Sequence, residues 1–327
     1  MSASPPSPPA ADTSAHSSTA NGAVISLTVK DTEGWRPVPG SPGRSLTTPT
    51  LCSHQGNLYA AYAEPDTGLV QYRALHHEEW REPEPVHEQA RTDTRPTLVS
   101  CAGSLWCLYT DRDTGLVHVH PINSSLPSTS PVALPYQQSC AAPSAVRIGP
   151  RRVRVAVRRG EQTVAIAEYR LPRRTGRAWS LKDQGWLTDD RFPQSMELAQ
   201  HGDTTWALHH GEDGSISATT WSPQRFGPLW TMEGQRTSHT PALTSHIGQL
   251  WLAHRDATTG RLLAASSPDG HTWSPFSPIT ATAVHAAAPC LTSHAGHLYA
   301  AHLDAHPHET TSCPAALPQG QDSPRTA

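Results

Sequence analysis

One segment recurs along the chain, and this repetition constrains the fold more than any other feature of the sequence. Its copies share the order Pro-x-Leu-x-Ser, a polar turn with glycine, and then Leu followed by Tyr or Trp. Four copies are clear and two are weaker; they start at Pro49, Pro96, Pro241 and Pro289, and near Pro143 and Ser195. The period is about 47 residues, which is typical of propeller blades rather than of helical solenoids.

Each unit carries the signals of four short strands. In the copy that starts at Pro241, an apolar run is followed by turns at 247–249, 257–260 and 268–270, with strand-like stretches between them. Glycine at the turns and short strands predict an antiparallel meander. One such sheet cannot bury both of its faces, whereas a ring of sheets stacked face to face can.

The last copy is incomplete, and this determines the expected number of blades. The unit from Pro289 supplies two strands and ends at Asp304, while residues 23–38 resemble the missing second half of a unit. We therefore predict an all-β, six-bladed β-propeller of four-stranded antiparallel blades, closed by a composite blade from both ends of the chain. The predicted organisation is a disordered Ser/Pro/Ala-rich tail over 1–22, a single propeller over 23–304, and a disordered Pro-rich tail over 305–327.

The distribution of charge and the absence of targeting signals in the sequence limit the classes of partner and the cellular location that we expect. The formal net charge is −3, and the acidic and basic residues are scattered except for arginines crowded into 147–177. Such an arginine cluster is typical of a nucleic-acid-binding surface. It is also typical of a charged blade edge that prevents the addition of further strands, and we favour this second interpretation. No apolar run reaches membrane-spanning length. The first residues lack a basic n-region and an apolar h-region, so we expect a cytoplasmic protein, with leaderless export left open.

Two recurring residue types are interpreted as structural. The six cysteines show no CxxC pair, so free thiols are expected. A tryptophan recurs near the start of the outer strand, and we expect it to pack between blades; its copies are Trp35, Trp80, Trp179, Trp230 and Trp273.

The stretch Ser267-Pro-Asp269-Gly270-His-Thr272-Trp273 resembles the Asp-box turn of sialidases and other bacterial propellers, although it lacks the residue that separates Asp from Gly in that pattern. Over 23–304 the repeat resembles sialidase-like and propeller-lectin proteins. The resemblance implies a propeller fold, in which the Asp-box caps a turn and has no catalytic role. The arginines, Tyr/Glu pair and acid/base Asp of a working sialidase cannot be placed in this sequence.

Aligned copies bring chemistry-bearing residues to one position of the second strand. That position holds Tyr62, Tyr109, Val157, His209, His254 and His302. Two residues on, and so on the same side of the strand, lie Glu64, Asp111, Arg159, Gly211, Asp256 and Asp304. Three interpretations stay open: packing between blades, a site for a small polar ligand such as a glycan, and a metal centre of His209, His254 and His302. No cofactor is favoured. A second histidine row, His54, His246 and His294, is interpreted as structural.

No GxSxG, P-loop, HExxH or GxGxxG signature occurs. The leading hypothesis is a lectin-like, carbohydrate-binding propeller without catalytic activity, whose partner is a glycan or another small polar ligand. Its predicted ligand-binding residues are Tyr62, Glu64, Tyr109, Asp111, His209, His254, Asp256, His302 and Asp304. The alternatives are a protein-interaction scaffold and a sialidase-like glycoside hydrolase or lyase. The enzyme would have one site at the channel mouth, with Asp256, Asp304, His254 and His302 as acid/base candidates.

Overall fold

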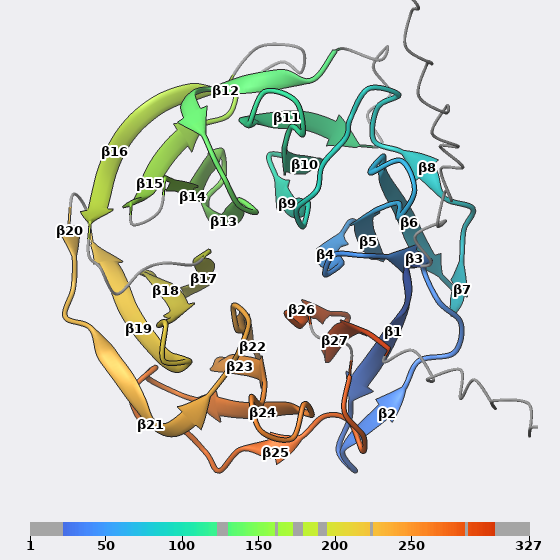
Figure 1. Cartoon of the computed structure of the whole chain (residues 1–327), viewed down its shortest axis with the longest axis vertical. Coiled ribbons are helices and arrows are strands. Elements are labelled where there is room, and N and C mark those ends of the chain that lie inside the picture. Colours follow the sequence, from blue (N-terminus) through green and yellow to red (C-terminus); the bar gives the residue numbers. More distant parts are fainter. Residues whose placement is uncertain are drawn as a thin grey trace, which may run out of the picture.

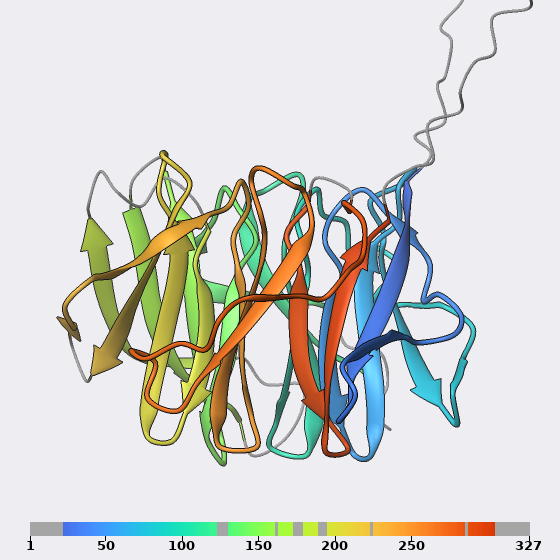
Figure 2. The ribbon, with the colours of Figure 1, turned by 90° about the horizontal axis from the view of Figure 1, so that it is seen from below.

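The computed structural model describes residues 22–122, 130–160, 163–172, 179–188, 195–222, 225–284 and 287–304. Over these residues the chain forms strands and no helix, and therefore has no helix that could cross a membrane. Six antiparallel sheets surround a central axis (Figure 1), and the view from the side shows a disk (Figure 2). The predicted six-bladed propeller is confirmed.

The blades follow one another in chain order. Blade 1 holds β4 (Thr50–His54), β5 (Asn57–Ala63), β6 (Val70–His76), β7 (Glu79–Trp80) and β8 (Glu84–Pro85). Blade 2 holds β9 (Thr97–Cys101), β10 (Ser104–Thr110), β11 (Leu116–Ile122) and β12 (Val132–Gln138). Blade 3 holds β13 (Ser144–Gly149), β14 (Arg152–Arg159), β15 (Thr163–Arg170) and β16 (Ser180–Thr188).

Blade 4 holds β17 (Glu197–His201), β18 (Thr204–His210), β19 (Ser215–Ser222), β20 (Arg225–Phe226) and β21 (Trp230–Arg236). Blade 5 holds β22 (Ala242–His246), β23 (Gln249–Arg255), β24 (Leu262–Ser267) and β25 (Ser277–Pro278). Blade 6 is composite and holds β26 (Cys290–His294), β27 (His297–Leu303), β1 (Ala23–Lys30), β2 (Trp35–Pro37) and β3 (Arg44–Ser45).

The two ends of the described chain meet in blade 6, as the incomplete last copy predicts. Strands β1 and β27 pair antiparallel from Ile25↔Leu303 to Lys30↔Leu298. Ile25 and Leu27 are fully buried in a core shared with blade 1. The predicted tails lie outside the described residues, apart from Gly22.

In each clear copy, the first turn has glycine as its second central residue, and the backbone conformation of the turn explains this choice. Gln55 and Gly56 both have positive φ, 46° and 81°. The same holds for Ala102–Gly103, Ile247–Gly248 and Ala295–Gly296. Two central residues with positive φ make the hairpin turn whose twist suits antiparallel strands, and glycine adopts this conformation without steric cost.

Histidine and serine at these turns link neighbouring blades. His54 Nδ1 lies 2.8 Å from Ser100 Oγ of the next blade. The pairs His201–Ser245, His246–Ser293 and His294–Ser53 repeat this contact at 3.0, 2.9 and 2.9 Å. The second histidine row is therefore structural, as expected: it joins inner strands around the ring.

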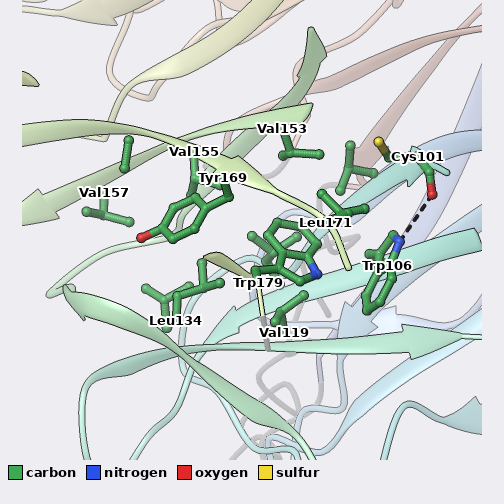
Figure 3. Close-up of a cluster of buried hydrophobic side chains, with 14 of the residues drawn as sticks. Cys101, Trp106, Val119, Leu134, Val153, Val155, Val157, Tyr169, Leu171 and Trp179 are labelled. Carbon is green, nitrogen blue, oxygen red and sulfur yellow. Dashed lines mark hydrogen bonds between the residues drawn. The ribbon is translucent and has the colours of Figure 1, made fainter. Parts of the chain in front are cut away.

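Large apolar side chains fill the gaps between blades. Between blades 2 and 3, Trp179 is 1% exposed and packs with Trp106 and Tyr169 (Figure 3). The indole nitrogen of Trp106 donates to the carbonyl oxygen of Cys101 at 3.2 Å. The other recurring tryptophans, Trp35, Trp80, Trp230 and Trp273, are partly buried against such clusters. Packing between blades is the role that the sequence predicts for them.

The arginine-rich segment lies in blade 3, and several of its members make contacts within that blade. Arg147 donates to the carbonyl oxygen of Gly149, and Arg151 donates to that of Leu171. The cysteines that the structure describes are free thiols, as expected.

The central channel is lined by the inner strands β4, β9, β13, β17, β22 and β26, around a cavity of about 300 Å³. An ion pair joins Arg95, which precedes β9 of blade 2, to Glu197 at the start of β17 of blade 4. Beyond this pair a second cavity, about 280 Å³, opens where the chain enters the inner strands; it is lined by Thr47, Thr48, Arg95, Ser195, His239 and Thr240, among others. This second cavity is the channel mouth.

Candidate functional site

The residues of the predicted second-strand row lie between blades. Tyr62, Tyr109, Val157, His209, His254 and His302 are all buried, and none is more than 6% exposed. His254 Nε2 lies 3.1 Å from the side-chain oxygen of Gln235, and its ring meets Phe276 edge to face. The aromatic ring of Tyr109 packs beside His118. These contacts match the packing interpretation of the row.

The acids two residues on cap the turns between second and third strands. Asp111 Oδ1 accepts hydrogen bonds from the backbone nitrogen and hydroxyl of Thr114, at 2.9 and 2.7 Å. Asp256 Oδ1 makes the same two contacts with Thr259, at 2.6 and 2.7 Å. Burial raises the pKa of both carboxyls, but the hydrogen bonds outweigh it and hold each pKa below its usual value. These two carboxylates therefore stabilise turns.

The candidates named for an enzyme or a metal centre are not gathered at the channel mouth. Among the described residues that line this cavity, none is Asp256, Asp304, His254 or His302. Asp304 accepts a hydrogen bond from Ser26 at 2.6 Å and lies 3.5 Å from the His302 imidazole. The part of the chain that the structure describes holds no group of three His, Cys, Asp or Glu side chains placed to bind a metal ion. His209, His254 and His302 are thus not brought together.

One pair of predicted ligand residues does share a pocket. Tyr62 and Glu64 line a cavity of about 270 Å³ at the edge of blade 1, together with Arg44 and Gln71. The side-chain oxygen of Gln71 is buried there without a hydrogen-bond partner among the described residues. An aromatic ring, a carboxylate and a guanidinium therefore meet at this position.

Buried imidazoles make the fold sensitive to acid. Burial lowers the pKa of His120, His210 and His254 to about 4. The unfolded chain, with a histidine pKa near 6.5, binds more protons below that pH than the folded chain does. The contribution of each neutral imidazole to the free energy of unfolding is therefore fully present above pH 6.5. It is lost as the pH falls towards 4, and the loss is roughly 1–3 kcal/mol for each imidazole. Urea unfolding at pH 7.5, 5.5 and 4.5 measures this loss. His254→Gln should reduce the slope, and a free energy independent of pH over this range would contradict the account.

One polar pocket was not predicted from the sequence. It lies between blades 3 and 4, has a volume of about 400 Å³, and is lined by Arg152, Arg154, Ile166, Glu168, Lys182, Asp183 and Trp221. We call it the Arg–Glu pocket.

Glu168 is the centre of the charged groups in this pocket. Arg152 donates to both of its carboxylate oxygens, at 2.7 and 3.1 Å. Arg154 approaches at 3.5 Å and Lys182 at 3.3 Å. Burial raises the pKa of Glu168, but the opposing effect of Arg152 and Lys182 is larger, and the net pKa lies below its usual value. The carboxyl is therefore ionised at neutral pH. The lining carries three cations and two carboxylates, and its balance is positive.

Arg154 is held in place from the neighbouring blade. Its side chain is 10% exposed, and one terminal nitrogen donates to the hydroxyl of Thr205 on β18. Thr205 in turn donates to the side-chain oxygen of Gln200 at 2.6 Å. The Nε of Arg154 is buried and has no hydrogen-bond partner among the described residues. A buried donor without an acceptor is energetically costly.

Trp221 of β19 forms the aromatic wall of the pocket. The ring packs so closely against β16 that a Cβ on Gly185 would lie 1.9 Å from it. Only glycine allows this approach, and Phe226 packs edge to face on Trp221. The indole is thus fixed from two sides.

Strand registers show that the pocket is a departure from the repeat. The cross-strand pair Arg154↔Glu168 corresponds to an aromatic residue opposite a non-aromatic uncharged one in the other blades: Tyr59↔Ala74, Trp106↔Pro121, Trp206↔Thr220, Trp251↔Ser266 and Tyr299↔Val29. Thr205 likewise occupies a position that is Leu or Val elsewhere: Leu58, Leu105, Val153, Leu250 and Leu298. Two of these departures, Arg154 and Glu168, line the cavity, and the third, Thr205, accepts a hydrogen bond from Arg154.

This arrangement can bind a polyhydroxylated molecule. Guanidinium and ammonium groups donate hydrogen bonds, carboxylates accept them, and an aromatic face packs against the C–H groups of a sugar ring.

The sequence matches no model of a known protein family and no curated protein. Among solved structures, the chain is similar to AofleA from Arthrobotrys oligospora, with a TM-score of 0.59 and 11% identity over 79% of each chain. It is similar to a fucose-specific lectin from Aleuria aurantia, with a TM-score of 0.57 and 10% identity over 74% of this chain and 82% of that one. It is also similar to a Hadza microbial sialidase, with a TM-score of 0.56 and 11% identity over 79% and 66%. At such identities these likenesses establish a shared propeller fold.

Proposed function

We propose that this protein is a lectin-like β-propeller that binds carbohydrate without catalysis, and that the Arg–Glu pocket holds the sugar. The observation that carries the proposal is the replacement of an aromatic interblade contact by Arg154 and Glu168, opposite the buried Thr205. A buried ion pair contributes little net stability compared with apolar packing. Its presence at one of six equivalent positions is therefore best accounted for by ligand recognition.

The similar solved structures support the proposal that this propeller binds carbohydrate. One of them is a fucose-specific lectin, and another structure of the Aleuria aurantia lectin contains α-methyl-L-fucoside. The pocket of Tyr62, Glu64 and Arg44 has the same three kinds of group as the Arg–Glu pocket. We include it as a second candidate for glycan binding.

A glycan array followed by calorimetry tests the proposal. Wild-type protein should bind a defined set of glycans, and Trp221→Leu should weaken binding of the best one at least tenfold, because it removes the aromatic wall. Leucine is the residue at the corresponding position of blade 1, Leu75, so the variant should fold. Trp35→Leu, in another interblade gap, is the matched control. Absence of any glycan signal from wild type would refute the proposal, and undiminished binding by Trp221→Leu would refute the site.

A further inference from the structure

A second pocket lies in the next interblade gap, between blades 4 and 5, and its chemistry is different. Its volume is about 410 Å³, and its walls include Trp230, Met232, Glu233, His271, Trp273 and Phe276. No lining residue is shared with the Arg–Glu pocket. We call it the aromatic pocket.

The aromatic rings of this pocket are fixed by their neighbours. The imidazole of His271 meets Trp230 edge to face at 4.5 Å and Trp206 at 5.3 Å. Phe276 rests against the buried ring of His254 at 5.1 Å. A ligand that enters therefore meets rings already in position, which lowers the entropy cost of binding.

The turn that carries Trp273 is equally rigid. Asp269 Oδ1 accepts hydrogen bonds from the backbone nitrogens of His271 and Thr272, both at 2.8 Å. Gly270 has a φ of 77°, and a Cβ there would lie 2.3 Å from Trp206. The indole nitrogen of Trp273 donates to the carbonyl oxygen of Gly270 at 3.2 Å. Since this N–H is already used, Trp273 offers a ligand its π-system rather than a hydrogen bond.

The formal charge among the described residues that line the aromatic pocket is negative. Glu233 is an acid on the outer strand β21, and no Lys or Arg is among the described residues that line the cavity. Trp230, Trp273 and Phe276 are only partly buried, so their rings are accessible. Aromatic faces attract cations electrostatically, and a neighbouring carboxylate adds to that attraction.

We infer that the aromatic pocket binds an organic ammonium group, of the quaternary or N-methylated kind, through cation–π contacts with Trp230, Trp273 and Phe276. Glu233 supplies the balancing negative charge. A compact ion such as Na⁺ is excluded from this role because the rings offer no oxygen ligands to replace its hydration shell. The site is independent of sugar binding in the Arg–Glu pocket.

Choline and 3,3-dimethyl-1-butanol form the decisive probe pair, because they have the same shape and differ in charge. Calorimetry on the full chain should give a Kd for choline on the order of 1 mM. Choline should bind at least tenfold more tightly than the neutral isostere. Phe276→Leu and Glu233→Gln should each weaken choline binding about fivefold, while Glu88→Gln, at an exposed acid of blade 1, should leave it unchanged.

Three results would overturn the inference. Equal affinity for choline and the isostere would show a merely apolar pocket, and absence of choline binding would show no site. Displacement of choline by the glycan that the Arg–Glu pocket binds would show a second sugar site instead. Trp221→Leu should bind choline as wild type does, which separates failure of this inference from failure of the lectin proposal.

Discussion

Exchanging Arg154 for tyrosine and Glu168 for alanine together should weaken sugar binding about 100-fold and leave the protein at least as stable as wild type. The double variant restores the Tyr59↔Ala74 pair of blade 1 at the equivalent cross-strand position. Replacement of a buried ion pair by apolar side chains is commonly neutral or stabilising, by about 1–4 kcal/mol. The sugar, however, loses two polar partners and should bind about 100-fold more weakly.

The single variants should behave differently from the double variant, because Glu168→Ala leaves Arg154 without its carboxylate, whereas after Arg154→Tyr the carboxylate of Glu168 keeps Arg152 and Lys182. Glu168→Ala strands Arg154 in a site where its side chain is 10% exposed and should cost about 3–5 kcal/mol. Thermal melting and calorimetry of the two single variants and the double variant measure this coupling. Arg36→Ala, at the exposed ion pair with Asp31, is the matched control and should cost less than about 1 kcal/mol. A double variant that binds sugar normally, or that unfolds, would contradict the account.

Removing residues 23–38 should eliminate cooperative unfolding altogether. These residues contain β1 and β2, so their loss leaves β27 with an unpaired edge and uncovers the core around Leu51, Leu58 and Leu303. Unpaired strand edges and exposed apolar surface also promote aggregation. Differential scanning calorimetry of this variant, compared with a chain that begins at Gly22, measures the effect. A truncated protein that melts like the longer one would show that the ring does not depend on closure by β1.

The fold could be predicted because the repeat encodes it at every position that matters for packing. The shared Pro-x-Leu-x-Ser segment marks the inner strand, and the x-Gly pair marks its turn. The likeness of Asp31…Trp35 to Asp269…Trp273 identified the missing half-blade. Pairing of β1 with β27 followed from these local signals without long-range information.

The Arg–Glu pocket was not predicted because the prediction used the positions at which the aligned repeats carry similar residues. Agreement reports what every blade needs: aromatic or histidine packing at Tyr62 and His254, and turn capping by Asp111 and Asp256. The capping role could have been predicted from the Asp-x-x-Thr-Gly pattern itself. Function at a single site requires the opposite signal, a copy that disagrees, and Arg154 among five aromatic counterparts was such a signal. The contribution of Thr205 and Trp221 could not be predicted, because it depends on how the next blade packs against blade 3.

A crystal structure of the protein with its best array glycan tests the central claim most directly. The account predicts density for a sugar ring between blades 3 and 4, packed on Trp221 and hydrogen-bonded to Arg154 and Glu168. Density in the channel mouth beside Thr47 and His239, with the Arg–Glu pocket free of sugar, would contradict it.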